Sequence, residues 1–497
     1  MAAREEFDVA VVGGGAAGAT MAARLSESGS RSVVLLEAGP DLRADLPDEI
    51  RDGWHMTRQF DWGYTSEPDE LGVVQNLRRV KLLGGTSSIT RFALRGSPAD
   101  YDEWEALGNA GWGFEDVLPY FKRLEADADY GDQPWHGDHG PIPVTRYRDL
   151  EPTEIHAGVL RALEGVGFPR VEDHNRPGAV GIGPMPMNSR DGARVTTASA
   201  YLPVGHTPPN LTIRTDTQVS DVVLAGTRAI GVRLLDGTVV GASCVVLSAG
   251  TYGSPPILMR SGIGPAEHLQ SVGIPVRLDL PGVGANLSDH PGADIDCGYR
   301  GVFRTAPLLH SIATFHSRGA ASEAPPDLML WVTDPGAPEN PPQFWIDIVL
   351  LKPHSRGSVR LRSADPADPP RINLPNFREP SDLERLAEGY RRAREVASLP
   401  EIRSLCDDPL PPEIGDEEEL RRTVRHGAYS VPHVVGTCSM GPSPDDGAVV
   451  DRSGRVFGTE RLFVVDASIM PTVPSGFTHI PTIMIAERLS EQIAALQ

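Results

Sequence analysis

Cysteine is scarce in this chain and occurs in no pattern that indicates a covalent link or a metal site. The four cysteines, Cys244, Cys297, Cys406 and Cys438, are scattered and form no Cys-x-x-Cys pair. Disulfide frameworks and structural zinc sites both need clustered cysteines. We therefore expect no disulfide framework, no metal, and a reduced protein located in the cytoplasm.

Positive charge is also in short supply. Lysine occurs three times, at Lys81, Lys122 and Lys352, and Lys+Arg total 46 against 67 for Asp+Glu, which gives a formal net charge of −21 at pH 7. A chain this acidic repels phosphate backbones and anionic lipid unless it carries a local basic patch, and the sequence has none. Nucleic acid is therefore not an expected partner.

Long apolar runs are missing as well. A bilayer-spanning helix needs roughly 18 or more consecutive apolar residues. The chain passes from Met1 almost directly into a strand-like segment at 7–12, without room for a cleavable apolar leader. Membrane insertion is not expected. The 497 residues, 40% hydrophobic and 23% charged, instead predict a globular protein of two or three structural units.

The first forty residues carry the clearest local motif. An apolar run at Val9–Val12 leads into Gly13-Gly-Gly-Ala-Ala-Gly18, a helical segment follows at 19–28, and a second apolar run at 33–36 ends at Glu37. This order predicts a βαβ unit in which Gly13 allows the tight turn, Gly15 lets a pyrophosphate approach the helix, and Gly18 lets helix and strand pack closely. Glu37 stands where a carboxylate accepts hydrogen bonds from ribose hydroxyls. The motif predicts an ADP-containing cofactor and leaves FAD and NAD open.

A second glycine-rich block separates these two cofactors in part. It runs Arg-Val-Lys-Leu-Leu-Gly-Gly-Thr-Ser-Ser-Ile-Thr from Arg79 to Thr90. Its small and hydroxyl-bearing residues predict a turn whose backbone amides meet phosphate or a flavin ring. Such a block is also common in ordinary loops, so it favours FAD only in combination with other motifs.

The rest of the chain divides into two kinds of pattern. Short β-rich segments at 211–214, 219–224, 229–235 and 239–247 predict strands, the last of them buried in the nucleotide-binding sheet. Between 301 and 430, proline clusters flank a strand-like segment at 344–351, and a helix is predicted at 383–398, which together indicate a second domain around an antiparallel sheet. A strand at 462–466 and a helix from Pro481 to Leu496 close the chain.

Two of the fourteen histidines stand out. His433 lies in an apolar, glycine-bounded segment, Val431–Gly441, and His479 lies just before the helix predicted from Pro481. Taken separately, each pattern is more typical of a histidine buried in a core than of a catalytic residue.

The chain resembles the glucose–methanol–choline (GMC) family of flavin oxidoreductases, and five motifs in order carry the resemblance. They are Gly13–Gly18 with Glu37, Arg79–Arg95 followed by Gly96–Trp104, Gly250–Pro265 continuing into Leu280–His290, Val464–Pro471, and Thr482–Glu487.

The resemblance implies a cofactor, a reaction and a set of site residues. It implies oxidation of a small-molecule alcohol by proton abstraction and hydride transfer to flavin N5, with electrons passed to O2 or another redox carrier. His433 is the implied base, since imidazole accepts a proton near pH 7, and His479 holds the same substrate oxygen. The implied FAD-binding residues are Gly13, Gly15, Ala16, Ala17, Gly18, Glu37, Ala38, Arg79, Gly84, Gly85, Thr86, Ser88, Ile89, Thr90, Val219, Ala249, Gly250, Asp466, Ala467, His479, Ile480 and Thr482. The alternatives are a hydroxynitrile lyase of the same fold with a redox-idle flavin, and a protein in which FAD is purely structural.

Two positions depart from the family pattern. Thr90 stands where many members carry Asn, which puts in doubt any contact made by that amide. Ile89 stands where some members carry a histidine that links covalently to the flavin. Because isoleucine has no nucleophilic atom, we expect noncovalent FAD.

The predicted architecture is α/β, with a Rossmann-like FAD-binding domain and a second α+β substrate domain built on an antiparallel sheet. The FAD-binding domain is expected to be discontinuous, formed by residues 1–45, 75–125, 205–300 and 432–497. Residues 46–74, 126–204 and 301–431 are expected to form the substrate-binding domain and lid segments.

Overall fold

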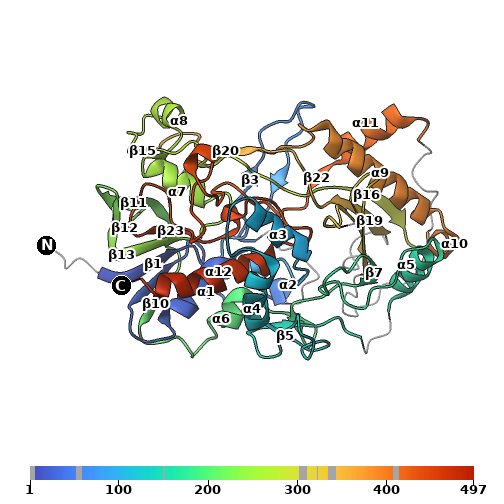
Figure 1. The fold of residues 1–497 in the computed structure, drawn as a ribbon, viewed down its shortest axis with the longest axis horizontal. Coiled ribbons are helices and arrows are strands. Elements are labelled where there is room, and N and C mark those ends of the chain that lie inside the picture. The colour runs from blue at the N-terminus through green and yellow to red at the C-terminus, as the bar shows by residue number, and fades with distance from the viewer. Residues whose placement is uncertain are drawn as a thin grey trace.

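The protein contains two large sheets that lie side by side (Figure 1). The computed structural model describes residues 6–51, 59–148, 152–301, 311–321, 323–333, 343–406 and 414–496. Both the first strand and the last helix belong to the same half of the molecule, on the left of Figure 1. The architecture is therefore α/β with a second, antiparallel unit, as predicted.

The first sheet is mostly parallel, as in nucleotide-binding α/β domains. Its strand order is β10-β2-β1-β13-β12-β11, and β23 also pairs with β13. The strands are β1 (Glu6–Val12), β2 (Val33–Leu36), β10 (Leu211–Arg214), β11 (Val219–Ala225), β12 (Arg228–Leu234), β13 (Val239–Leu247) and β23 (Leu462–Val464). β1 pairs in parallel with β2 and with β13, with Val9 opposite Val33 on one side and Cys244 on the other. Its buried residues form a continuous apolar run because helices and loops cover both faces.

Helices from the two ends of the chain cover one face of this sheet. α1 (Ala16–Ser26) lies beside α12 (His479–Ala494), and α4 (Phe114–Leu124) packs on α12 (Figure 1). Arg24 of α1 donates to both carboxylate oxygens of Glu487 on α12, a residue with no exposed surface. Because a buried carboxylate is costly without a partner, this ion pair ties the C-terminal helix to the first βαβ unit.

The second sheet is antiparallel and has the order β22-β16-β19-β18-β17-β7. Its strands are β7 (Gly181–Pro184), β16 (Pro291–Gly298), β17 (Ser311–Phe315), β18 (Leu328–Thr333), β19 (Gln343–Leu350) and β22 (Tyr429–Ser430). α9 (Pro380–Ala397) covers one face, where Phe344, Ile346 and Ile348 of β19 are buried. Because side chains alternate along a strand, the residues between them face the first domain.

The predicted elements agree with the structure except at their ends and at one boundary. α1 begins at Ala16 rather than at Ala19. α12 begins at His479 rather than at Pro481, so His479 lies inside the first helical turn and not before it. β16 belongs to the antiparallel sheet, so the expected FAD-domain segment 205–300 runs past the point, Pro291, where the chain enters the second sheet. The other domain boundaries stay predictions.

The remaining elements lie in the segments between these strands and helices. They are α2 (Asp48–Arg51), β3 (Tyr64–Thr65), β4 (Asn76–Leu77), η1 (Gly85–Ser88), α3 (Pro98–Ala106), β5 (Glu125–Asp127), β6 (Ile142–Val144), α5 (Glu154–Gly165), β8 (Ser189–Arg190), β9 (Ala193–Arg194), α6 (Thr197–Tyr201), α7 (Ser254–Arg260), β14 (Ile263–Gly264), α8 (Ala266–Ser271), β15 (Leu278–Asp279), β20 (Ser358–Arg360), β21 (Arg371–Asn373), α10 (Pro400–Arg403), α11 (Glu417–Gly427), η2 (Pro444–Asp446) and η3 (Ala467–Ile469).

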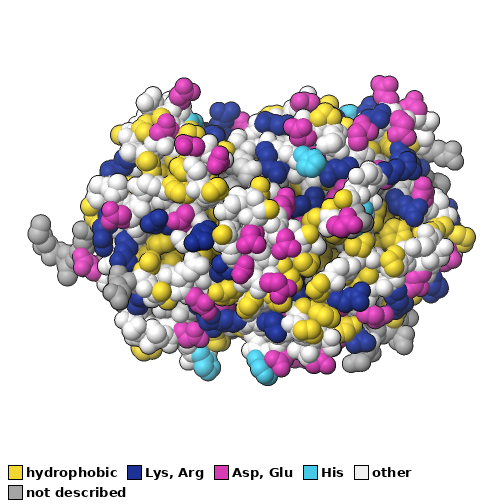
Figure 2. Space-filling view, viewed as in Figure 1, with side chains coloured by type: hydrophobic (Ala, Val, Ile, Leu, Met, Phe, Trp, Pro, Cys, Tyr) yellow, Lys and Arg dark blue, Asp and Glu magenta, His cyan; other side chains and the backbone are white. Residues whose placement is uncertain are grey.

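The surface bears mixed charge. On the face shown in Figure 2, Lys and Arg side chains are interspersed with Asp and Glu side chains. Within the described ranges, every helix is too short or too polar to cross a membrane.

Candidate functional site

The carboxyl ends of the parallel strands bring the predicted cofactor residues together. β1 ends before Gly13, β2 before Glu37, and β23 two residues before Asp466. β13 leads into Gly250, whose amide donates to Asp466 Oδ2 at 2.9 Å. In open α/β sheets, ligands bind at this edge.

The first glycine turn has the geometry that its sequence predicts. Gly13 has φ +95°, and a Cβ there would lie 2.5 Å from Ser248 O. A Cβ at Gly18 would lie 1.7 Å from Gly13 O, so the helix packs directly on the turn. At Gly15 the nearest heavy atom to such a Cβ is 4.0 Å away, so the space in front of this residue is open. The turn is therefore tightly packed at Gly13 and Gly18 and more open at Gly15.

The start of α1 has unsatisfied hydrogen-bond donors. Its N-cap is Gly15, no side chain caps it, and no acidic residue lies in its first turn. The first amides of a helix have no partner within the helix, and the helix dipole is positive there. Ala16 and Ala17 carry no bulky side chain there, so this end of the helix fits a diphosphate.

The second glycine block packs against the first. Gly84 donates its amide to Gly14 O at 2.8 Å, and a Cβ at Gly85 would lie 2.8 Å from Gly15 Cα. Gly84 and Gly85 have φ values of +106° and +52°. The block continues through Thr86, Ser88, Ile89 and Thr90, where the amides of Ile89 and Thr90 both donate to Thr86 O. The two glycine blocks therefore lie against each other, a contact that the sequence motifs did not predict.

Glu37 is buried and fastens the loops around it. Its Oε2 accepts the Gly14 amide at 2.6 Å and its Oε1 accepts the Gly39 amide at 2.8 Å. Burial raises the pKa of Glu37 to about 7, against the lowering effect of these amides. Each carboxylate oxygen keeps a further lone pair, so the residue can hold its loops and still accept a ligand hydroxyl. Thr217, two residues before Val219, donates its amide to Glu37 O.

Asp466 organises the opposite side of the strand edge. Besides the Gly250 amide, it accepts the Ser254 hydroxyl at 2.6 Å and caps η3, which begins at Ala467. Ala249 donates its amide to Ser254 Oγ at 3.1 Å. Burial raises the pKa of Asp466.

A pair of histidines lies where two distant segments run antiparallel. Ser288 and Val435 exchange backbone hydrogen bonds, and the Val431 amide donates to His290 O. This pairing places His290 Nδ1 at 3.0 Å from His433 Nδ1, across 143 residues of sequence. His290 is fully buried and His433 is half-buried.

The hydrogen bonds around this pair assign its tautomers. His290 Nε2 lies 3.1 Å from Pro474 O, a carbonyl that can only accept, so Nε2 carries the proton. Burial and Lys352 lower the pKa of His290 to about 3, so the ring is neutral and its Nδ1 is an acceptor. His433 Nδ1 must then donate to it, which leaves the lone pair of neutral His433 on Nε2.

Neighbouring groups also fix the backbone of His433 and lower the pKa of its ring. The His433 amide donates to Asp289 Oδ1 at 2.8 Å. Burial, His290 and Arg79 hold the pKa of His433 well below its ordinary value. Arg79 itself donates to Pro432 O at 3.0 Å. At neutral pH, His433 is therefore an uncharged imidazole with one available acceptor nitrogen.

His479 is placed differently from the sequence expectation. It is the first residue of α12, and burial lowers its pKa to about 4. Its Nε2 is buried and has no hydrogen-bond partner. His433 and His479 make no hydrogen bond to each other. Phe477, two residues before His479, has its ring centroid 4.6 Å from that of His433. Ile480 and Thr482 follow in the same helical turn, with Thr482 Oγ1 donating to Thr478 O.

Sequence reasoning missed two members of this site. Asp289 and His290 end the segment Leu280–His290, which contributes to the family resemblance, but the sequence assigns them no role. An Asp-His pair just before a strand was the available signal. Only the pairing of two segments far apart in the chain brings them to His433.

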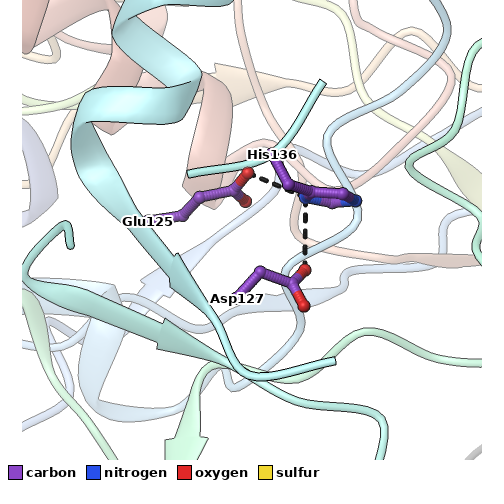
Figure 3. A group of neighbouring side chains, drawn as sticks. All are labelled: Glu125, Asp127 and His136. Atoms are coloured by element: carbon purple, nitrogen blue, oxygen red, sulfur yellow. Dashed lines mark hydrogen bonds and ion pairs between the residues drawn. The ribbon is translucent and has the colours of Figure 1, made fainter. Parts of the chain in front are cut away.

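A second cluster of titratable residues lies elsewhere, and its carboxylates form ion pairs with His136 and Arg146. Figure 3 shows Glu125 and Asp127 pointing toward His136, whose Nδ1 lies 2.8 and 3.2 Å from them, while its Nε2 lies 3.0 Å from Asp173. Arg146 donates to Asp127 and Asp173 at 2.8 and 2.7 Å. Burial opposes protonation of His136, but its hydrogen bonds to Asp173 and Glu125 outweigh this effect and raise its pKa. The cluster is a buried ion-pair network.

Comparisons with known proteins match this chain to one family over nearly its whole length. Residues 7–292 and 353–486 match the N- and C-terminal models of the family described as GMC oxidoreductase. The chain is 36% identical to the 5-(hydroxymethyl)furfural oxidase of Methylovorus sp. (strain MP688), with 98% of each protein covered. It is 33% identical to the oxygen-dependent choline dehydrogenase of Pseudomonas fluorescens (strain Pf0-1), with 99% of this chain and 94% of that protein covered. The solved structure of pyridoxine 4-oxidase from Mesorbium loti is similar at a TM-score of 0.91 and 31% identity, over 99% of both chains.

Proposed function

The chain belongs to the GMC oxidoreductase family, and from this premise we propose that it is an FAD-dependent enzyme that oxidises a small-molecule alcohol, with His433 as the base. The observation that carries the proposal is the proton arrangement of the histidine pair. His290 accepts from His433 Nδ1 and thereby leaves His433 Nε2 as an acceptor.

The residues at the strand edge fit FAD. The uncapped start of α1 at Gly15, Ala16 and Ala17 suits the pyrophosphate, because its amides are unsatisfied and the space in front of Gly15 is open. Glu37 suits the ribose, and Val219, the first residue of β11 and two residues after Thr217, which donates its amide to Glu37 O, suits the adenine side. Residues assigned to the flavin half are Arg79, Gly84–Thr90, Ala249, Gly250, Asp466, Ala467, Ile480 and Thr482.

The start of α12 adds an electrostatic contribution. Helix N-termini stabilise negative charge in their vicinity, and His479, Ile480 and Thr482 form the first turn of this helix. Binding is noncovalent at Ile89, because its alkyl side chain offers no atom for a link.

His433 would accept the proton that the alcohol's hydroxyl group loses in the reaction. Bound FAD supplies the two-electron acceptor that takes hydride from the carbinol carbon. His433 Nε2 takes the hydroxyl proton, the carbon–oxygen single bond becomes a carbonyl, and the aldehyde or ketone leaves. As His433 becomes positively charged, its Nδ1–H bond to His290 strengthens. His290 is thus a positioning residue that fixes the tautomer of the base.

His479 is proposed to hold the substrate oxygen. Its buried Nε2 has no protein partner, and an unpaired buried nitrogen is costly unless a ligand satisfies it. Because its pKa is lowered to about 4, it is neutral at pH 7 and donates or accepts without carrying charge. Holding the oxygen orients the carbon for hydride loss.

The test is anaerobic reduction of the bound flavin. A substrate alcohol should bleach it stoichiometrically without oxygen, whereas a hydroxynitrile lyase or a structural flavin would stay oxidised. His433→Ala should slow reduction about 10²–10⁴-fold, the worth of a general base, with flavin still bound. His479→Asn should cost less, because Asn keeps a hydrogen-bond donor. Full rates in both variants would remove the assignment, and parallel assays with O2 and an artificial dye identify the acceptor.

A further inference from the structure

Two of the four cysteines lie against each other in the core of the second domain. Cys297 is on β16, and Cys406 lies three residues after the end of α10. Their side chains are in hydrogen-bond contact, and both belong to the buried cluster beneath α9. Both cysteines are free thiols in the structure. We call Cys297 and Cys406 the thiol pair.

A backbone pairing holds the thiol pair in register. Tyr299 and Cys406 form an antiparallel bridge, and the Arg300 amide donates to Leu405 O at 2.9 Å. Side chains two residues apart along a strand share a face, so Cys297 points to the same side as Tyr299. Diagonal neighbours across an antiparallel pair lie within reach of each other. The contact between the two thiols therefore follows from the pairing of two segments that are distant in the sequence.

The groups around the thiol pair make its two members unequal. The hydrogen bond from Cys297 and the nearby guanidinium of Arg403 lower the pKa of Cys406, against the raising effect of burial. The same hydrogen bond, burial and the charge of Asp296 raise the pKa of Cys297. Arg403 is held at this position because its Nη1 donates to Cys406 O at 3.3 Å. Since the thiolate is the reactive form of cysteine, Cys406 is the nucleophile of the pair and Cys297 stays protonated.

The other two cysteines have surroundings that keep them protonated. Burial raises the pKa of Cys244 to about 12. Burial and the charge of Asp466 raise the pKa of Cys438 well above its ordinary value. Buried cysteines without thiolate character are inert toward oxidants. Cys244 and Cys438 therefore serve as internal controls for any reaction of the thiol pair.

The thiol pair is buried but lies near exposed chain. Cys297 and Cys406 are 2% and 0% exposed, whereas Ser404, two residues before Cys406, is exposed. α10 lies at the end of the molecule opposite the first sheet (Figure 1), far from the proposed cofactor residues. We therefore expect small uncharged oxidants to reach the pair more readily than bulky reagents.

From this geometry we propose that Cys297 and Cys406 are a peroxide-sensitive pair that closes to a disulfide. The Cys406 thiolate attacks one oxygen of hydrogen peroxide, the O–O bond breaks, and the departing hydroxide takes up a proton and leaves as water. Cys297 then attacks the sulfur of the sulfenic acid formed on Cys406 and gives up its proton. The S–O bond breaks, a second water leaves, and the S–S bond forms. Two thiols and one peroxide thus give one disulfide and two waters.

The disulfide would tie β16 to the segment that follows α10. β16 begins at Pro291, directly after His290. The cross-link closes a loop of about 110 residues, and a cross-link stabilises more as the loop that it closes becomes longer. Oxidation should therefore raise the Tm of the protein by several degrees, and dithiothreitol should reverse this rise. The inference is independent of the proposed function, because neither cysteine belongs to the proposed cofactor or substrate residues.

The experiment counts thiols in the native holoenzyme after treatment with hydrogen peroxide and removal of the excess by catalase. Thiols titrated after denaturation should fall from four to two, and peptide mass spectrometry should find one disulfide, between Cys297 and Cys406. Cys406→Ser should keep all its remaining thiols and show no rise in Tm. Cys297→Ser should form a sulfenic acid on Cys406 that dimedone labels. Cys297→Ala and Cys406→Ala replace these variants if a buried hydroxyl prevents folding.

Cys244→Ser and Cys438→Ser are the matched controls, because each removes one buried cysteine and leaves the thiol pair intact. Both should still lose two thiols to peroxide and gain the reversible rise in Tm. Three results in the native protein would overturn the proposal: four intact thiols after excess peroxide, a disulfide that includes Cys244 or Cys438, or a sulfinic acid on Cys406 without a disulfide.

Discussion

Replacing His290 tests the proton arrangement on which the proposed mechanism depends. His290→Phe keeps a flat ring of similar size but removes both nitrogens, so His433 Nδ1–H and Pro474 O lose their partners at 3.0 and 3.1 Å. Phe477 and Asp289 still hold the His433 ring and backbone. We therefore expect FAD to remain bound while the base loses its fixed tautomer.

The size of the effect follows from the charge that His433 gains in the transition state. A hydrogen bond to a charged group contributes about 1.5–3 kcal/mol, and each 1.36 kcal/mol is a factor of ten in rate. His290 has no exposed surface, so we expect water not to replace this hydrogen bond and apply the full range. Flavin reduction should slow roughly 10–200-fold in His290→Phe.

Two further variants make this measurement decisive. His290→Gln offers a carbonyl oxygen to His433 and an amide donor to Pro474 O, so it should recover most of the rate. His174→Phe controls for the replacement of a buried neutral histidine, since burial lowers the pKa of His174 to about 4 at a position that the reaction does not use. Rates come from anaerobic stopped flow at equal flavin occupancy. If His290→Phe reduces its flavin at the native rate, the tautomer reasoning is refuted.

The remaining predictions concern the cofactor and the pH dependence. Acid precipitation should leave yellow FAD in the supernatant, because Ile89 cannot form a link; colour in the pellet would contradict this. Glu37→Ala should raise the Kd of FAD roughly 10–200-fold by removing charge-assisted hydrogen bonds. Glu37→Gln, which keeps an acceptor oxygen, should raise the Kd less. Equilibrium dialysis measures both Kd values, and an unchanged Kd would place the ribose elsewhere. Because the pKa of His433 is lowered, the imidazole stays unprotonated as the pH falls through 6.5. The rate of flavin reduction should therefore decline only below pH 6.5. A decline in rate centred at pH 6.5 or above would show that His433 is not the group that titrates.

Local patterns in the sequence determined the nucleotide-binding half of the protein. The strands predicted at 211–214 and 239–247 coincide with β10 and β13, and the turn glycines occupy the conformations expected of them. These features depend on residues close in sequence: apolar runs define strands, and Gly13 and Gly18 allow contacts within one βαβ unit. Helix ends were predicted less accurately: α12 starts at His479, two residues before the predicted start at Pro481.

Only the tertiary structure decided which distant residues meet. Cys297 and Cys406, isolated in the sequence, lie in hydrogen-bond contact, and this contact raises the pKa of Cys297. Glu125, His136 and Asp173 join one ion-pair network. His290 reaches His433 because an antiparallel β-bridge joins Ser288 to Val435, next to the pairing of β16 with β22. Strand pairing between such distant segments depends on the registry of whole sheets, and a registry shift of one residue turns every side chain to the other face. The chain therefore specifies its first glycine turn locally, while the hydrogen bond between His290 and His433 exists only in the folded protein.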